Sequence, residues 1–377
     1  MTQVCVFPIT ICAANLASCV LITCIIFHCE VSMATPAANA STNRHLFLTC
    51  ESGKLIQFDT ETCRHHTLFQ GQSPDYLFGI ACRDSMVYFA GCTFLAMANI
   101  RSQGFEFVKM VTPFKPLRGM HNRVMRYVWT ELGAHSRVIP YGKPDLHQMN
   151  IYDSTVYVTA TSWNEIWLLD LDLNLKQRIQ IQPHIRNYHH LNNVVCDGQH
   201  FYVCLNRYER SGGSGGYAKF DLGWNEVERR ALGWESHALS VIDGEIVHLC
   251  CSTEGAGKEI RHPRRAGLMI DDTLVFEYDP SQYYCKDFSM DDERIYVVGG
   301  ENTTRERRKE AAGVVFILNR NYELLRKCVM PGIGGLNGCR LSGLDYSNGT
   351  MRIPSASRAF GDSYHHEEKT MAMEVPR

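Results

Sequence analysis

Three histidines at nearly equal intervals are the residues of this sequence best suited to chemistry. His147, His190 and His237 each lie at or just before a predicted strand, in three successive repeats. Imidazole binds Zn, Fe or Cu, and three protein ligands leave one position open for water or substrate. A divalent metal there could activate water or polarise a carbonyl, which predicts a metal-dependent hydrolase or lyase. The alternative is that these histidines only line a watery channel and hydrogen-bond to neighbouring backbone.

A second set of residues could hold an anionic ligand beside the histidines. The predicted ligand-binding residues are Lys286, Arg118, Arg265, Asn192 and Asn337. Basic residues gather in the predicted loops 113–145, 252–267 and 301–312, although the whole chain has 38 Lys and Arg against 40 Asp and Glu. Segregated positive charge predicts that a small anionic molecule or an acidic peptide binds there. The alternative is a solvated rim that only keeps the protein soluble.

The elements that must position these side chains form a repeat that occurs five times. An apolar run, an Asp-led tight turn and a second run recur, and the second runs end at Tyr88, Tyr157, Tyr202, Val247 and Tyr296. The steps between these ends are 69, 45, 45 and 49 residues, close to the ~40–50 residues of a four-stranded propeller blade. Asp-Gly and Asp-Ser pairs favour two-residue hairpin turns. The repeat therefore predicts an all-β protein, a β-propeller.

The ends of the repeat region predict how the ring closes. Segment 45–69 supplies three strands and segment 336–341 supplies one, so that together they make one further blade. Strands from both ends of the repeat region then pair in one sheet, which removes the free sheet edges that an open ring would have. We therefore predict six blades. Seven would need a hidden blade in the long first step.

Loop lengths predict which face of the propeller is used. The turns between the first and second strands of each blade are short, whereas the connections on the other face are long. Long loops on a rigid scaffold are where binding groups usually lie. The innermost strands also start on this face, so His147, His190 and His237 are expected to converge at the mouth of the central channel. A non-catalytic scaffold that binds another protein with the same face is the alternative function.

Three segments carry a family resemblance. Residues 188–198, 234–244 and 296–302 resemble a family of bacterial β-propeller proteins of unknown function, in which repeats led by histidine recur. The similarity covers roughly residues 45–345, a span that suits a single propeller of this repeat length. The resemblance implies a six-bladed propeller but no particular reaction.

Composition divides the chain into three parts. We expect an apolar or disordered leader at 1–44, the propeller at 45–346 and a polar tail at 347–377. No Lys or Arg precedes Arg44, so the basic region of a secretory signal is missing and Met33 is the preferred start. We expect a cytoplasmic protein. Secretion, or anchoring in a membrane through residues 1–29, is the alternative.

The positions of the cysteines and the net charge indicate the redox state of the thiols and the kind of partner. Five of the 16 cysteines lie in the leader, most of the others fall in predicted strands, and no CxxC pair occurs. Cysteine in a strand behaves as a small buried hydrophobe, so we expect reduced core thiols. The near-neutral charge predicts no specific nucleic-acid partner.

Overall fold

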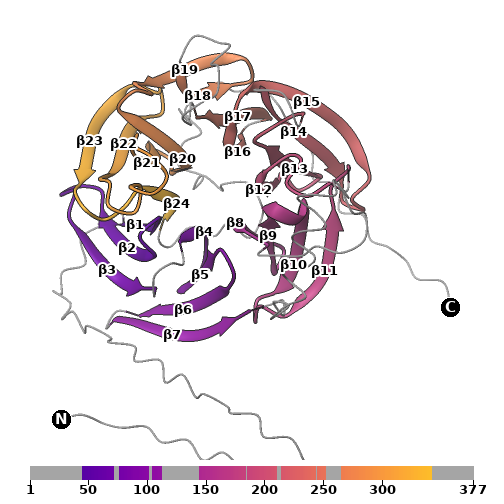
Figure 1. The fold of residues 1–377 in the computed structure, drawn as a ribbon, viewed down its shortest axis with the longest axis horizontal. Coiled ribbons are helices and arrows are strands. Elements are labelled where there is room, and N and C mark those ends of the chain that lie inside the picture. Colours follow the sequence, from indigo (N-terminus) through magenta and orange to yellow (C-terminus); the bar gives the residue numbers. More distant parts are fainter. Residues whose placement is uncertain are drawn as a thin grey trace, which may run out of the picture. The chain divides into compact units, whose positions relative to one another are not determined.

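The propeller prediction is confirmed. The computed structural model describes residues 45–71, 76–101, 104–112, 144–183, 185–209, 214–242, 244–251 and 265–341. Within these ranges, 24 strands form six four-stranded antiparallel sheets. The sheets stand around a central axis as the blades of a propeller (Figure 1). Six blades are therefore correct and the seven-bladed alternative is wrong.

Five blades are built from consecutive strands, with the first strand innermost. Blade 1 comprises β4 (Leu77–Arg83), β5 (Met86–Gly91), β6 (Leu95–Arg101) and β7 (Gly104–Val111). Blade 2 comprises β8 (Leu146–Tyr152), β9 (Thr155–Ala160), β10 (Glu165–Asp170) and β11 (Leu175–Gln180), with the short 3-10 helix η1 (Thr161–Trp163) between β9 and β10. Blade 3 comprises β12 (Leu191–Cys196), β13 (His200–Leu205), β14 (Ser214–Asp221) and β15 (Glu226–Trp234).

The remaining two blades complete the ring. Blade 4 comprises β16 (Ser236–Ile242), β17 (Glu245–Cys250), β18 (Ala266–Ile270) and β19 (Thr273–Tyr278). Blade 5 comprises β20 (Tyr283–Met290), β21 (Arg294–Glu301), β22 (Gly313–Asn319) and β23 (Leu324–Met330). Blade 6 comprises β24 (Leu336–Leu341), β1 (His45–Cys50), β2 (Lys54–Asp59) and β3 (His65–Gln70).

Blade 6 closes the ring as expected from the sequence. The C-terminal strand β24 pairs antiparallel with β1, and Leu46 lies opposite Leu341 and Leu48 opposite Cys339. β24 is the innermost strand of this sheet, and β2 and β3 follow outward. Strands from the two ends of the propeller thus share one sheet, which leaves neither end as an unpaired edge at the seam.

Burial falls from the axis outward, which explains the sequence pattern of the strands. The inner strand β12 is buried along its whole length, whereas the outer strands β3 and β11 are mostly exposed. Neighbouring sheets pack face to face, as where Leu48 and Ile56 of blade 6 meet Tyr296 of blade 5. The outer strands therefore carry many polar residues, whereas the inner strands combine apolar residues with buried polar ones such as Asn192 and Asn193.

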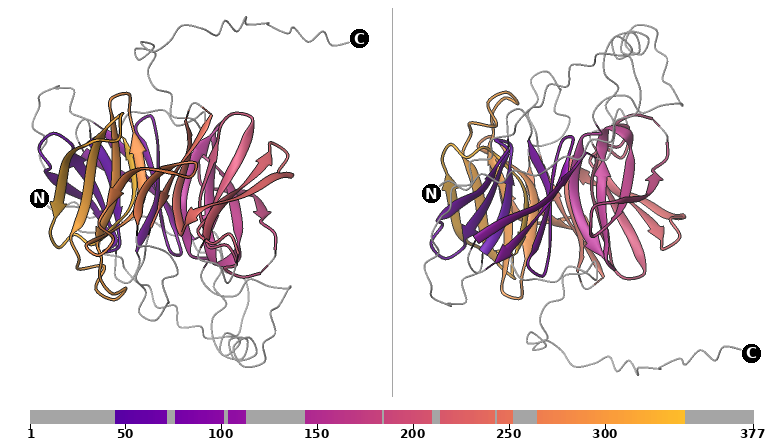
Figure 2. Two further views of the ribbon diagram at one scale, coloured as in Figure 1. Left: turned by 90° about the horizontal axis from the view of Figure 1, so that it is seen from above. Right: turned by 90° about the horizontal axis from the view of Figure 1, so that it is seen from below.

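The hairpin turns follow the predicted chemistry. Asp153 and Ser154, between β8 and β9, both have positive φ, at 43° and 61°. A primed two-residue turn needs this conformation, because its twist matches that of the flanking strands. Seen from the side, the strands of every blade run between the two faces of the ring (Figure 2). Because each inner strand starts on the same face, equivalent residues of the six blades meet at one end of the channel.

One disulfide corrects the expectation that all core cysteines are reduced. Cys63, in the turn after β2, is joined to Cys328 on β23 of the neighbouring blade, with a Cα–Cα distance of 5.8 Å. The other nine cysteines in the described ranges are buried thiols. The two bonded residues are 265 positions apart in the sequence, so only ring closure brings them together. The disulfide links blade 6, which contains the first and the last strand of the propeller, to blade 5.

No helix in the described part of the chain is long and apolar enough to cross a membrane. The predicted leader 1–44 and tail 347–377 lie outside the described residues. The boundaries of these segments and the cytoplasmic location therefore stay predictions.

Candidate functional site

A β-bulge interrupts every inner strand at the same height in the channel. The register of each inner strand shifts at Leu77/Ile80, Leu146/Met149, Leu191/Val194, Ser236/Ala238 and Cys285/Asp287, and that of blade 6 shifts at Thr49/Cys50 on the partner strand. A bulge adds a residue that lacks a partner in the ladder and re-aims its side chain. Six residues at these bulges line one pocket, and we call them the channel ring: Phe78, His147, Asn192, His237, Lys286 and Asn337.

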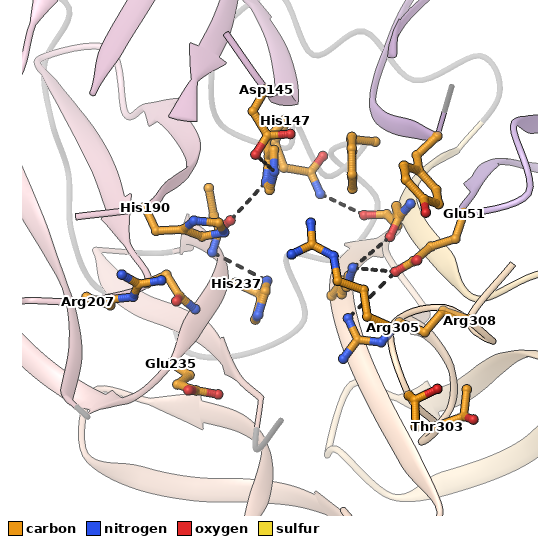
Figure 3. Close-up of a pocket in the computed structure, with 18 of the residues that line it drawn as sticks. Glu51, Asp145, His147, His190, Arg207, Glu235, His237, Thr303, Arg305 and Arg308 are labelled. Carbon is orange, nitrogen blue, oxygen red and sulfur yellow. Dashed lines mark hydrogen bonds and ion pairs between the residues drawn. The ribbon is translucent and has the colours of Figure 1, made fainter. Parts of the chain in front are cut away.

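The pocket occupies the mouth of the channel and has a volume of about 490 Å³. Its walls include six of the eight residues predicted to bind the ligand or a metal, namely His147, His190, Asn192, His237, Lys286 and Asn337. Figure 3 shows these histidines on one side of the pocket and Glu51 with Arg308 on the other. The volume is in the range that usually accommodates a small molecule.

Hydrogen bonds fix the histidine side of the channel ring. The Asn192 Nδ2 group donates to the Ser236 carbonyl at 2.8 Å, so Oδ1 of Asn192 must face His147. The His147 Nδ1 lies 3.2 Å from this oxygen and is therefore the donor. The Nδ1 atom of His237 lies 3.4 Å from Asn192 Nδ2, which favours an acceptor at this atom and a proton on Nε2. Asn192 thus sets the orientation of both rings.

The opposite side of the channel ring is organised by Lys286. Its ammonium group donates to Glu51 at 2.7 Å and to Oδ1 of Asn337 at 3.0 Å. The Phe78 ring lies 5.8 Å from this cation and stacks on His147, with ring centroids 4.5 Å apart and planes 13° apart. Phe78 therefore bridges the cationic and the imidazole side of the pocket.

His190 joins the pocket from the residue just before β12. Its φ is 51°, and its Nδ1 lies 2.9 Å from Oδ1 of Asn187, which makes Nδ1 the donor. The His190 ring meets His147 edge to face at 5.1 Å between centroids. Burial lowers the pKa of His190 to about 3, and nearby His147, Arg207 and Lys286 add to the shift. His190 is therefore a neutral imidazole whose Nε2 can accept a hydrogen bond.

Burial and nearby charges also shift the pKa values of two other groups in the pocket, His237 and Asp145. Burial, followed by the Lys286 charge, lowers the pKa of His237 well below its ordinary value. Burial alone would raise the pKa of Asp145, but the charge and hydrogen bond of His147, together with the charges of His190 and Arg305, lower this pKa to about 2. The Asp145 carboxylate lies 3.6 Å from Nε2 of His147. The pocket thus holds an ionised carboxylate beside His147 and two neutral imidazoles.

The three histidines meet in one pocket, as predicted, but two of them already use ring nitrogens. Nδ1 of His147 donates to Asn192, its Nε2 faces Asp145, and Nδ1 of His190 donates to Asn187. In the described part of the chain, no group of three or more His, Cys, Asp and Glu side chains is arranged to hold a metal ion. A bound Zn, Fe or Cu ion stays a prediction.

Arginines of the loop after β21 form the rim of the pocket. Arg308 stacks on Tyr284 at 4.6 Å, and its guanidinium lies 3.9 Å from Glu51. The Arg305 side chain reaches over the middle of the pocket (Figure 3). No described residue forms an ion pair with Arg305. The segment 301–312 is therefore the basic loop that meets the channel.

Two buried polar atoms in the pocket walls lack hydrogen-bond partners among the described residues. They are Nε of Arg308, a donor, and Oε1 of Gln148, an acceptor. Buried polar groups are nearly always paired, so each such atom needs an explanation. Both atoms have almost no accessible surface, so a bound molecule would reach them only after a movement of neighbouring side chains.

Polar links across the channel close the floor of the pocket. Gln148 donates to the Asn337 carbonyl at 2.9 Å. Below it, Arg340 binds the carboxylate of Asp287 at 2.7 Å and reaches the Met149 carbonyl at 3.4 Å. These contacts join blades 2, 5 and 6 across the axis. The pocket is therefore a closed cup at one end of the channel.

Two predicted ligand-binding residues are not part of this pocket. Arg265 is exposed and pairs with Glu277 at 3.0 Å, and it is not among the lining residues. Arg118 lies outside the described residues. Sequence reasoning missed Glu51 and Asp145 as site residues, and it placed Arg305 and Arg308 only in a generally basic loop. Glu51 carries no signal in the sequence, whereas Asp145 directly precedes an inner strand that begins with a predicted site residue.

The fold and the pocket define a six-bladed β-propeller with a polar pocket at the mouth of its channel. No protein-family model and no curated protein matches the chain. Among solved structures, the chain is similar to a protein of unknown function from Bacteroides caccae, with a TM-score of 0.53 and 9% identity over 80% of this chain and 99% of that one. It is also similar to a chain of a nidogen/laminin complex, with a TM-score of 0.48 and 12% identity over 79% of this chain and 98% of that one. At such low identity the similarity concerns the fold. Membership of a bacterial family with His-led repeats stays a prediction.

Proposed function

We propose that the pocket at the channel mouth binds a small anionic molecule, such as a carboxylate or a phosphate. The observation that carries the proposal is the Arg305 guanidinium, which reaches over the pocket without an ion pair among the described residues (Figure 3). A guanidinium presents a planar fork of donors that matches a carboxylate or phosphate. A ligand there would gain a charge-assisted hydrogen bond at its anionic end.

The distribution of charge in the pocket supports an anion at the rim and a neutral polar group below it. The lining contains four basic residues, Arg207, Lys286, Arg305 and Arg308, and four acidic ones, Glu51, Asp145, Glu235 and Glu306. Lys286 and Arg308 share Glu51, and Asp145 faces His147. Deeper in the pocket, Nε2 of neutral His190 offers an acceptor. A hydroxy acid or a sugar phosphate has this combination of groups.

Replacing Arg305 with alanine should weaken the binding of small anions about 10–100-fold, because a hydrogen bond to a charged group contributes about 1.5–3 kcal/mol. Acetate, malate, citrate and inorganic phosphate would be titrated against the full chain, with melting temperature and calorimetry as readouts and glucose as the neutral control. Binding of at least one anion to the wild type is expected.

The matched control is Arg265→Ala, which removes an arginine on the same face of the propeller but outside the pocket. This variant should bind as the wild type does. If none of the four anions binds, or if Arg305→Ala binds them as tightly as Arg265→Ala, the anion proposal is wrong. A non-catalytic scaffold that uses the long loops for a protein partner would then be the better candidate.

A second candidate function is a metal-dependent hydrolase or lyase acting on the bound anion. The gathering of His147, His190 and His237 in one pocket favours it. Elemental analysis of purified protein should then find one Zn, Fe or Cu ion per chain, and the His147→Ala/His237→Ala double variant should lose it. The metal content of a His66→Ala variant should be unchanged, because His66 is exposed on the outer strand β3. Equal metal content in the wild type and the double variant would remove this candidate.

A further inference from the structure

A cluster of soft donor atoms lies in the core of blade 4, apart from the residues that line the pocket. His248 and Cys250 are two positions apart on β17, so both side chains point to the same face of the sheet. Met269 on β18 lies directly opposite His248 and points to that face as well. All three residues are buried, with exposed fractions of 1%, 0% and 4%.

The donor atoms of this cluster stand at the separations of metal ligands. Sγ of Cys250 is 3.5 Å from Nδ1 of His248 and 3.4 Å from Sδ of Met269. Metal–sulfur bonds of about 2.3 Å and metal–nitrogen bonds of about 2.0 Å in tetrahedral geometry place neighbouring donors roughly 3.5–3.8 Å apart. A small movement of the side chains would therefore admit an ion between them.

The protonation of His248 suits the role of a ligand. Its Nε2 lies 2.7 Å from the carbonyl oxygen of Asp271, so Nε2 must be the donor. The neutral ring then has its lone pair on Nδ1, which faces Cys250. A backbone carbonyl that fixes the ring in this way is the usual support of a metal-binding histidine. The single proton of the Cys250 thiol cannot satisfy both Nδ1 and Sδ.

A glycine of the neighbouring blade covers the cluster. Gly233 has a φ of 51°, and a Cβ atom there would lie 2.4 Å from Sγ of Cys250, 3.1 Å from Cε1 of His248 and 3.2 Å from Sδ of Met269. Any other residue would push the three donors apart. Gly233 is itself partly exposed.

We propose that His248, Cys250 and Met269 form a binding site for a soft monovalent metal ion, with Cu(I) as the natural occupant. Thiolate and thioether sulfur select soft ions, and imidazole is a common ligand of copper. Copper enters as Cu(I), the Cys250 thiol releases its proton to solvent as the sulfur–copper bond forms, and no electron is transferred. The site is independent of the anion pocket, since none of its three ligands lines that pocket.

Titration of the full chain with Cu(I) under anaerobic conditions, in competition with a chromophoric Cu(I) chelator, tests the proposal. Cys250→Ala should lose one equivalent of tightly bound copper. Met269→Leu should weaken the same equivalent at least tenfold, and it keeps the side-chain volume, so the fold is preserved. X-ray absorption of the wild-type complex should find sulfur neighbours near 2.3 Å and nitrogen near 2.0 Å.

Matched controls separate this site from the other thiols and from the pocket. Cys82→Ala and Met97→Leu change a buried cysteine and a buried methionine of blade 1, and the His147→Ala/His237→Ala variant changes the pocket. All three should keep the equivalent that Cys250→Ala loses. The proposal is overturned if Cys250→Ala and Met269→Leu, folded by circular dichroism, bind as much Cu(I) as tightly as the controls do.

Discussion

Replacing Arg340 with methionine is expected to destabilise the propeller by about 3–5 kcal/mol, because it leaves the carboxylate of Asp287 buried without a counter-charge. The side chains of Arg340 and Asp287 are only 8% and 2% exposed and lie 2.7 Å apart. Asp287 also accepts a hydrogen bond from the Cys339 amide at 3.0 Å, which alone cannot replace the guanidinium. Urea denaturation at pH 7 would measure the loss.

The double variant Arg340→Met/Asp287→Leu should recover most of that stability. Replacing both partners of a buried ion pair with apolar residues is often neutral, whereas removing one is costly. Arg265→Met is the control, because its pair with Glu277 is exposed and should contribute at most about 1 kcal/mol. A single variant within 1 kcal/mol of the wild type, or a double variant no more stable than the single one, would contradict this account of the channel floor.

Lowering the pH from 6.5 to 5 should destabilise the protein by about 3 kcal/mol through His190 and His237 together. The slope for each histidine rises from about 0.7 kcal/mol per pH unit at pH 6.5, where the unfolded histidine is half protonated, to about 1.4 kcal/mol per pH unit near pH 5. Their pKa values in the folded protein are lower than the ordinary 6.5, about 3 for His190. Below pH 6.5 these two histidines therefore bind protons in the unfolded chain but not in the folded protein. The free energy of unfolding consequently falls as the pH falls. Asp145 contributes nothing in this window, because its lowered pKa matters only below its ordinary 3.8.

The variant His190→Asn isolates one of these groups. Asparagine tolerates the positive φ at this position, so the backbone should be retained. The slope of unfolding free energy against pH between 5 and 6 should drop by about 1.4 kcal/mol per pH unit relative to the wild type. His66→Asn on the exposed strand β3 should leave the slope unchanged. Identical slopes for the wild type and His190→Asn would show that His190 is not held neutral.

The fold could be predicted because the sequence pattern of each blade recurs along the chain. Asp-led turns at steps of 45, 45 and 49 residues, after a longer first step of 69, identify four-stranded blades, and the complementary ends at 45–69 and 336–341 identify the closing blade. The disulfide between Cys63 and Cys328 could not be predicted, because each cysteine sits in a different part of its blade. Only the angle between blades 5 and 6 brings them within 5.8 Å.

The candidate site could be predicted in part, for the same reason. His147, Asn192, His237 and Lys286 occupy one position of the repeat, and rotation about the axis brings equivalent positions together. The repeat could not reveal the bulges that turn these side chains into the channel. It also could not reveal Glu51, which directly follows β1 and accepts a hydrogen bond from Lys286. Contacts of that kind depend on the width of the channel and not on the period of the sequence.

The pairing of β1 with β24 has a consequence for how the protein is made. Leu46 needs Leu341 as its neighbour, so β1, which leaves the ribosome before the other strands of the propeller, can pair with β24 only after all of them have been made. Blades 1 to 5 can assemble in order during translation, since each is built from consecutive strands. The ring itself locks only once residue 341 has emerged, and until then the N-terminal hairpin of blade 6 has an exposed edge that a chaperone or a second chain could bind.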